Sequence, residues 1–179
     1  ATPEPEPEPV ETPIGFSVAV EAHQDPATAR DRLQRIREMD PDVTFYVAPV
    51  PIGGGVWYRL LAGPVTDREA GLTLMQRLVD AEVKTAFDDW AVRPTTLAFH
   101  LGEFASMAAA ETRVAELAER EIPAYVVPIR YEPGGTRHRV YGGAFETRGA
   151  ASVMQEMLTD VGIDAPLIER VGVPLEVGE

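Results

Sequence analysis

The amino-acid sequence contains an internal repeat of about eighty residues. Residues 45–94 align with residues 125–174 at a shift of eighty positions, which places Arg59 on Arg139. Further upstream the repeat continues at a shift of eighty-one positions. A unit of this length is the size of one small domain. The function must therefore be one that two similar small modules, or a cleft between them, can perform.

Each half follows the order strand, helix, strand, strand, helix, strand. In the first half we expect an alternating strand near Phe16–Val20 and a helix that begins after the cap Asp25. Glycines 53–55 supply a tight hairpin turn, and Thr66 with Glu69 predicts a capping box for the second helix. Short strands joined by a glycine turn form an antiparallel hairpin.

The second half repeats these signals. Leu97, Phe99 and Leu101 alternate along its first strand, and Ser106 is the expected helix cap. The fourth strands are expected near Lys84–Trp90 and Ala165–Val171. The predicted fold class is α+β: two ferredoxin/RNP-like β-α-β-β-α-β repeats, each a four-stranded antiparallel sheet with two helices on one face.

Four segments follow from this pattern. Residues 1–14 alternate proline with glutamate, which predicts an extended stalk because proline fixes φ and like charges repel. Residues 15–94 form the first repeat and residues 95–173 the second. Residues 174–179 form an acidic tail. No secretory leader is recognised ahead of the stalk, so we expect a mature product whose leader or anchor has been removed.

Charge and composition exclude several partners. The net charge is −13, so nucleic acid, whose phosphates need a basic surface, is not an expected partner. The chain has no cysteine, which excludes disulfides, thiolate metal sites and a cysteine nucleophile. No run of about eighteen apolar residues occurs, so no direct membrane insertion is expected.

Catalytic and metal-binding patterns are missing from the sequence. The histidines His23, His100 and His138 lie in three different elements without metal-ligand spacing, and no serine stands in a nucleophile elbow. Asp88 and Asp89 are neighbours on an expected strand, so their carboxylates point to opposite faces. We therefore expect a protein that is not an enzyme, with no catalytic residue, no metal site and no cofactor.

Two motifs in each half resemble those of the sporulation-related repeat (SPOR) family. Residues 99–104 read Phe-His-Leu-Gly-Glu-Phe and residues 18–20 read Val-Ala-Val, similar to the family's first strand, aromatic-x-Val-Gln-hydrophobic-Gly-Ser-Phe. Residues 139–145 read Arg-Val-Tyr-Gly-Gly-Ala-Phe and residues 59–65 read Arg-Leu-Leu-Ala-Gly-Pro-Val, similar to the family's Arg-Val-x-Val-Gly-Pro-Phe. The resemblance covers about residues 15–172. It departs at the family glutamine, which is Ala19 in the first half and His100 in the second.

The resemblance implies a non-catalytic module of the bacterial cell envelope, located in the periplasm. Its implied partners are peptidoglycan glycan strands that lack stem peptides, often at division sites, with envelope or division proteins as further candidates. Glycan binding in the family uses the sheet face opposite the helices. This expectation rests on the resemblance, whereas the elements and exclusions above rest on the residues themselves.

Strand alternation selects the residues that the outer faces would offer to a glycan. An aromatic ring beside guanidinium donors suits a sugar, whose C–H groups stack on the ring while its oxygens accept hydrogen bonds. The candidate ligand-binding residues are Trp57, Arg59, Leu61, His100, Arg137, Arg139 and Tyr141. The competing interpretation is that these side chains pack between the halves or pair with acidic residues. Trp90 is expected to fill the hinge between the repeats.

A second hypothesis concerns the protein as a whole. The family glutamine is absent from both halves and the balance of charge is acidic, as expected of degenerate repeats that act as a protein–protein interaction scaffold in the envelope. A large interface between the halves that covers Trp57 or Tyr141 would favour this hypothesis. Open sheet faces would favour glycan binding.

Overall fold

The computed structural model describes residues 8–10, 12–87 and 91–176, and the other residues lie outside the described part of the chain. The acidic pair 88–89 and the expected hinge residue Trp90 fall among those other residues. Among the described residues, no helix is both long and apolar enough to cross a membrane.

The first repeat is a four-stranded antiparallel sheet with two helices. Its strands stand in the order β3-β4-β2-β5. The elements are β2 (Phe16–His23), α1 (Pro26–Met39), β3 (Thr44–Ile52), β4 (Gly55–Val65), α2 (Arg68–Asp80) and β5 (Val92–Pro94).

The second repeat has the same plan with one strand added at its edge. Its strand order is β1-β7-β8-β6-β9, and β1 comes from the N-terminal end of the chain. The elements are β1 (Glu8–Pro9), β6 (Leu97–Phe104), α3 (Met107–Glu119), β7 (Tyr125–Glu132), β8 (Gly135–Phe145), the 3₁₀ turn η2 (Gly149–Ala151), α4 (Ser152–Asp160) and β9 (Leu167–Glu169). The predicted α+β class with two repeats is confirmed.

The helix starts follow from side chains that accept backbone hydrogen bonds. Asp25 caps α1 by accepting from the N–H of Thr28 at 3.1 Å, as predicted. The cap of α2 is Asp67, which accepts from the N–H of Ala70 at 2.8 Å, so the prediction of a capping box from Thr66 was wrong by one residue. The prediction of the fourth strand of the first repeat near Lys84–Trp90 was wrong, since β5 is Val92–Pro94 and follows that range. The fourth strand of the second repeat, β9 (Leu167–Glu169), lies within the expected range but is shorter.

The two hairpins differ by one residue, and this corrects the alignment of the repeats. Ile52 pairs with Gly55, which leaves two residues in the first turn. Tyr131 pairs with Gly135, which leaves three residues in the second. Because of the extra residue, strands β3 and β7 align at a shift of seventy-nine positions instead of eighty. Tyr46, opposite Leu61, is therefore equivalent to Tyr125, opposite Tyr141.

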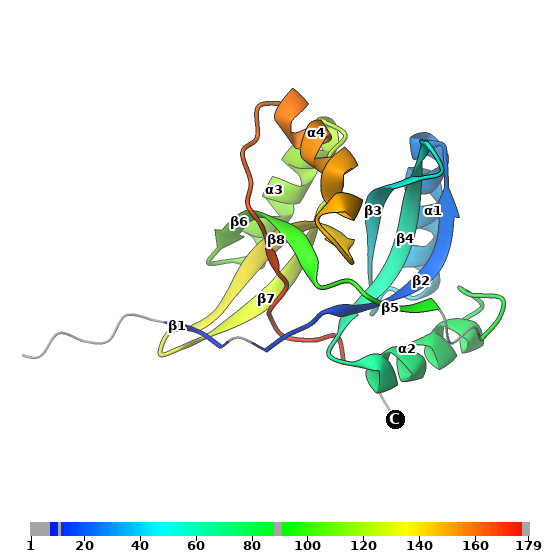
Figure 1. The fold of residues 1–179 in the computed structure, drawn as a ribbon. Helices are drawn as coiled ribbons and strands as arrows, with labels where there is room; N and C mark the ends of the chain where they lie inside the picture. Colours follow the sequence, from blue (N-terminus) through cyan, green and yellow to red (C-terminus); the bar gives the residue numbers. More distant parts are fainter. Residues whose placement is uncertain (1–7, 11, 88–90, 177–179) are drawn as a thin grey trace, which may run out of the picture.

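The first sheet is buried on both faces. On one face, residues such as Leu60 and Ala62 pack with α1 and α2 in a core of their own. On the other face, Tyr46, Val50 and Leu61 belong to a second core that contains the interior of the second repeat. Strand β3 lies beside β8 and α4 of the second repeat (Figure 1). The two repeats therefore share one of their hydrophobic cores.

A buried arginine lies in the interface between the repeats. Arg170 is 1% exposed. Its five N–H donors are all used, by oxygens of Ser17, Tyr46, Thr95 and Tyr125 at 2.8–3.3 Å. None of the described acidic residues forms an ion pair with it. A guanidinium group stays charged even when buried, so this network of neutral oxygens must stabilise its charge.

The two ends of the chain are exchanged between the repeats (Figure 1). The N-terminal segment 8–14 leads into the first repeat but binds the second: the N–H of Val10 donates to the carbonyl of Arg130 at 2.7 Å, and Ile14 is fully buried in the shared core. The tail after β9 returns to the first repeat, where the N–H of Leu175 donates to the carbonyl of Pro64 at 2.8 Å and its side chain packs on the core there.

These two segments also pair with each other. The N–H of Gly172 donates to the carbonyl of Thr12 at 3.0 Å, and Pro13 forms an antiparallel bridge with Val171. The described part of the predicted stalk is thus extended but lies along the second repeat. The described residues of the predicted acidic tail, 174–176, are likewise docked on the protein.

Candidate functional site

The outer face of the second sheet carries a cluster of polar side chains around one carboxylate. Glu103 on β6 accepts a hydrogen bond from the Tyr131 hydroxyl at 2.5 Å, from Arg139 Nε at 3.0 Å and from Arg137 Nε at 3.3 Å. We call these four residues the Glu103 cluster. Strand pairing explains their convergence, because Glu103 lies directly opposite Arg139 across β6 and β8.

The members of the cluster differ in how far they reach solvent. The side chain of Arg139 is 10% exposed, and its remaining nitrogen Nη1 donates to the Tyr141 hydroxyl at 3.0 Å. Tyr141 itself is fully buried and hydrogen-bonded to the backbone of Val171. Arg137 is different, since 42% of its side chain is exposed. Among the predicted residues of this sheet, Arg137 is therefore the one with a guanidinium group that an external ligand can contact.

Charge in the cluster is partly compensated. Burial raises the pKa of the Glu103 carboxyl, but the hydrogen bond from Tyr131 and the charges of Arg139 and Arg137 lower it by more, so this pKa lies below its usual range. One carboxylate and two guanidinium groups leave a single positive charge. His100, opposite Tyr141 on the same face, adds none at neutral pH, because burial and the charge of Arg139 lower its pKa.

The corresponding face of the first sheet is covered by the second repeat. Leu61 is 1% exposed and belongs to the shared core, and Trp57 packs against that core. Arg59 lies 4.0 Å from a carboxylate oxygen of Glu146, which follows β8 in the second repeat. The expectation of an open outer face was therefore wrong for the first sheet. It was wrong for much of the second sheet as well, where Tyr125, Val127, Ile129 and Tyr141 are buried. Strand alternation identifies the residues of one face but does not reveal what packs on that face.

Arg59 and Arg139 stand at equivalent positions of the two repeats, but the residues opposite them on the neighbouring strand differ. Arg139 has Glu103 opposite it, whereas Arg59 has Ala22 at the same place in its sheet. Without a carboxylate on the neighbouring strand, Arg59 reaches Glu146 of the other repeat. Sequence reasoning missed Glu103 and Tyr131 as site residues. The signal for Glu103 was present, since an acidic residue stands where the SPOR pattern has serine.

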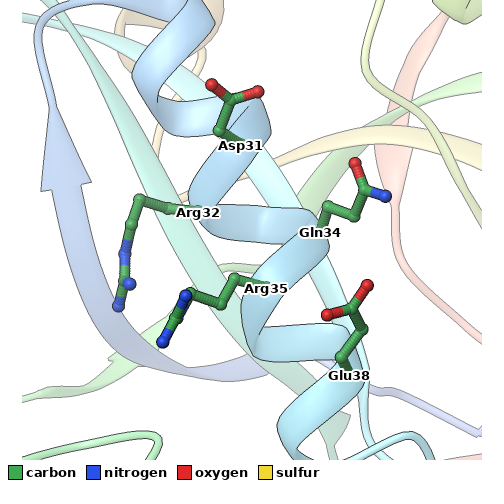
Figure 2. A pocket seen from close by; sticks show the side chains of 5 residues that line it. All are labelled: Asp31, Arg32, Gln34, Arg35 and Glu38. Carbon is green, nitrogen blue, oxygen red and sulfur yellow. The ribbon is translucent and has the colours of Figure 1, made fainter.

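The hollows on the described surface do not form an alternative site. One of about 510 Å³ lies on the solvent-facing side of α1 and is lined by charged and polar side chains of that single helix, which Figure 2 shows spread over successive turns: Asp31, Arg32, Gln34, Arg35 and Glu38. Ligand pockets are usually concave, mostly apolar and built by several elements. A second cavity, of about 60 Å³ beside Val10 and Gly172, lies between the two terminal segments. It is far smaller than a usual ligand site.

The described residues contain no metal-binding cluster. No three of their histidine and acidic side chains are placed to hold a metal ion. His138 lies on the helix-facing side of β8, opposite Pro128. Its buried Nδ1 has no hydrogen-bond partner among the described residues.

Comparison with known proteins gives one family. A family model described as SPOR domain matches residues 12–93 and again residues 94–168. The two matches adjoin, cover most of the chain and correspond to the two repeats of the fold. Searches of curated proteins and of solved structures gave no match.

Proposed function

This chain belongs to the SPOR domain family, and on that premise we propose that it binds peptidoglycan glycan strands through the Glu103 cluster and catalyses no reaction. SPOR domains are peptidoglycan-binding modules, and the family is associated with the cell envelope. The proposal extends to the periplasm as the location and to glycan strands without stem peptides as the preferred ligand.

The observation that supports this proposal is the half-exposed guanidinium of Arg137, which donates to the same oxygen of Glu103 as the Tyr131 hydroxyl. Sugar hydroxyl and acetamide oxygens accept hydrogen bonds from a guanidinium group, and sugar C–H groups pack on an aromatic ring. Glu103 holds both side chains through hydrogen bonds of 2.5 and 3.3 Å. A site held in place before binding loses less entropy when the ligand arrives.

Within this proposal the second repeat carries the binding surface. Leu61 and most of the outer face of the first sheet are inside the shared core, and so are Tyr125, Val127, Ile129 and Tyr141 on the outer face of the second sheet. The proposed surface is therefore limited to the part of the second sheet around the half-exposed Arg137. Arg139 and Tyr141 would then act as support for Arg137 and Glu103, and His100 would border the site as a neutral side chain.

Co-sedimentation with purified sacculi tests the proposal. The full chain is expected to pellet with sacculi, and to pellet more strongly after an amidase has removed the stem peptides. Arg137→Ala should reduce pelleting, whereas Arg130→Ala, an exposed arginine on the opposite face of the same hairpin, should not. Absence of pelleting with both kinds of sacculi would contradict the proposal.

The second candidate function is a protein–protein interaction scaffold. It is favoured by the shared core, which covers Leu61 and packs against Trp57, and by the burial of Tyr141. An affinity pull-down from an envelope extract tests it. Recovery of a protein partner by the wild type, retained by Arg137→Ala, would favour the scaffold; recovery of glycan fragments alone would favour the first candidate.

A further inference from the structure

Arg137 has binding capacity that the protein itself does not use. Its Nε donates to Glu103 at 3.3 Å, which fixes the orientation of the guanidinium plane. Among the described residues, its two terminal nitrogens have no hydrogen-bond partner. With 42% of the side chain exposed, these nitrogens can donate several hydrogen bonds to a group arriving from solvent.

The other charges around Arg137 are already paired. Arg139 directs Nε and Nη2 to Glu103 and Nη1 to Tyr141. Glu103 in turn accepts hydrogen bonds from three side chains, and its lowered pKa keeps it ionised at neutral pH. The cluster therefore keeps one net positive charge, and among its two guanidinium groups that of Arg137 is the more exposed to solvent. A planar guanidinium with free terminal nitrogens best fits a planar anion that accepts two parallel hydrogen bonds.

We propose that Arg137 binds a carboxylate of the glycan strand, namely the lactyl carboxylate of a muramic acid residue that has lost its stem peptide. This inference rests on the proposed function. In an intact strand the lactyl group is joined to the stem peptide through a neutral amide. Hydrolysis of that amide releases the peptide's amino group and leaves a carboxylate on the sugar. The same reaction thus removes the bulky peptide and creates the anion that Arg137 recognises.

This recognition gives a chemical reason for preferring stripped strands. An amide offers a single carbonyl oxygen and no charge, whereas a carboxylate offers two oxygens and a full charge. A sugar polymer that lacks the lactyl group offers neither. The site therefore discriminates by charge in addition to any steric effect of the peptide.

Titration calorimetry with three soluble probes tests the inference on the full chain. The first is a tetrasaccharide of alternating N-acetylglucosamine and N-acetylmuramic acid with free lactyl carboxylates. The second is the same tetrasaccharide with those carboxylates converted to methylamides. The third is chitotetraose, which has no lactyl group. The wild type is expected to bind the acid about tenfold more tightly than the methylamide or chitotetraose. One exposed charge-assisted contact contributes about this much to binding affinity.

Binding measurements on variants, and at different salt concentrations, test whether the preference for the carboxylate probe depends on Arg137. Arg137→Gln should bind the acid and the methylamide equally, and Arg137→Lys should keep part of the preference because it keeps the charge but loses the planar fork. Arg130→Gln removes the same charge from the opposite face and should behave as the wild type. In the wild type, added salt should weaken binding of the acid and leave binding of the methylamide almost unchanged.

The outcomes separate this inference from the proposed function. Equal binding of all three probes by the wild type would overturn the carboxylate inference and leave glycan binding intact. An equal loss in Arg137→Gln and Arg130→Gln would also overturn it, because a general field effect would then explain the preference. Failure of the wild type to bind any probe, together with failure to pellet with sacculi, would overturn both.

Discussion

The aromatic rings of Tyr46 and Tyr125 stack on each other, with their centroids 4.2 Å apart and their planes 17° from parallel. These two tyrosines occupy equivalent positions in the two repeats, because each lies opposite the equivalent residue of the neighbouring strand. Equivalent residues of a symmetric pair meet only near the twofold axis. The repeats therefore face each other around an approximate twofold axis that passes beside this pair.

Arg170, next to the stacked tyrosines, should be important for stability. Arg170→Ala leaves the hydroxyl groups of Ser17, Tyr46, Thr95 and Tyr125 without their common donor and opens a cavity. We expect the free energy of unfolding to fall by about 3–5 kcal/mol, measured by urea denaturation. Arg30→Ala on the exposed side of α1 should change it by less than about 0.5 kcal/mol. A similar small effect of both changes would contradict the assigned role.

Separated repeats should not fold alone. A fragment of residues 1–94 exposes the face of Leu61 and Tyr46, and a fragment of residues 95–179 lacks the buried Ile14. We expect neither fragment to show a cooperative thermal transition by circular dichroism, and an equimolar mixture to regain one. A cooperative transition of either fragment by itself would show that the shared core is dispensable.

Acid should weaken the Glu103 cluster. Because the pKa of Glu103 is lowered in the folded protein, its stabilising contribution is present above the unfolded pKa and is lost as the pH falls through the folded pKa. Glu103→Gln should lose roughly 1 kcal/mol at neutral pH and show a shallower decline of stability between about pH 5 and pH 3. The measurement is urea denaturation across that range. Parallel pH profiles of variant and wild type would contradict this assignment.

The cap of α2 can be tested with neighbouring residues. Asp67→Ala removes the acceptor for the N–H of Ala70 and should cost about 1 kcal/mol of stability. Thr66→Ala should cost much less, since the Thr66 side chain only approaches the Asp67 carboxylate, at 3.5 Å. The reverse order of effects in thermal denaturation would restore Thr66 as the cap.

The sequence determines the local elements of this fold well, for physical reasons. Apolar alternation and helix caps are encoded by neighbouring residues, so Asp25 and Ser106 could be identified directly as caps. Alternation also assigned Arg59 and Leu61 correctly to the side away from the helices. The extra residue in the second hairpin was not recognised, because its effect appears only in the pairing of β7 with β8.

Contacts between distant segments are what sequence reasoning could not predict. Nothing in the neighbours of Leu61 indicates that β8 and α4 cover it, and the proline-rich composition of residues 1–14 predicts an extended chain without identifying its binding partner. The site shows the same limit. Glu103 could be seen as a departure from the family motif, but Tyr131 is brought to it from another strand, 28 positions further along the chain.

The exchange of the end segments has a consequence for the evolution of the two halves. Ile14 is buried in the core that contains the interior of the second repeat, and Leu175 packs on the core of the first. A substitution in one end segment therefore acts on the stability of the opposite repeat, so the two halves cannot diverge independently.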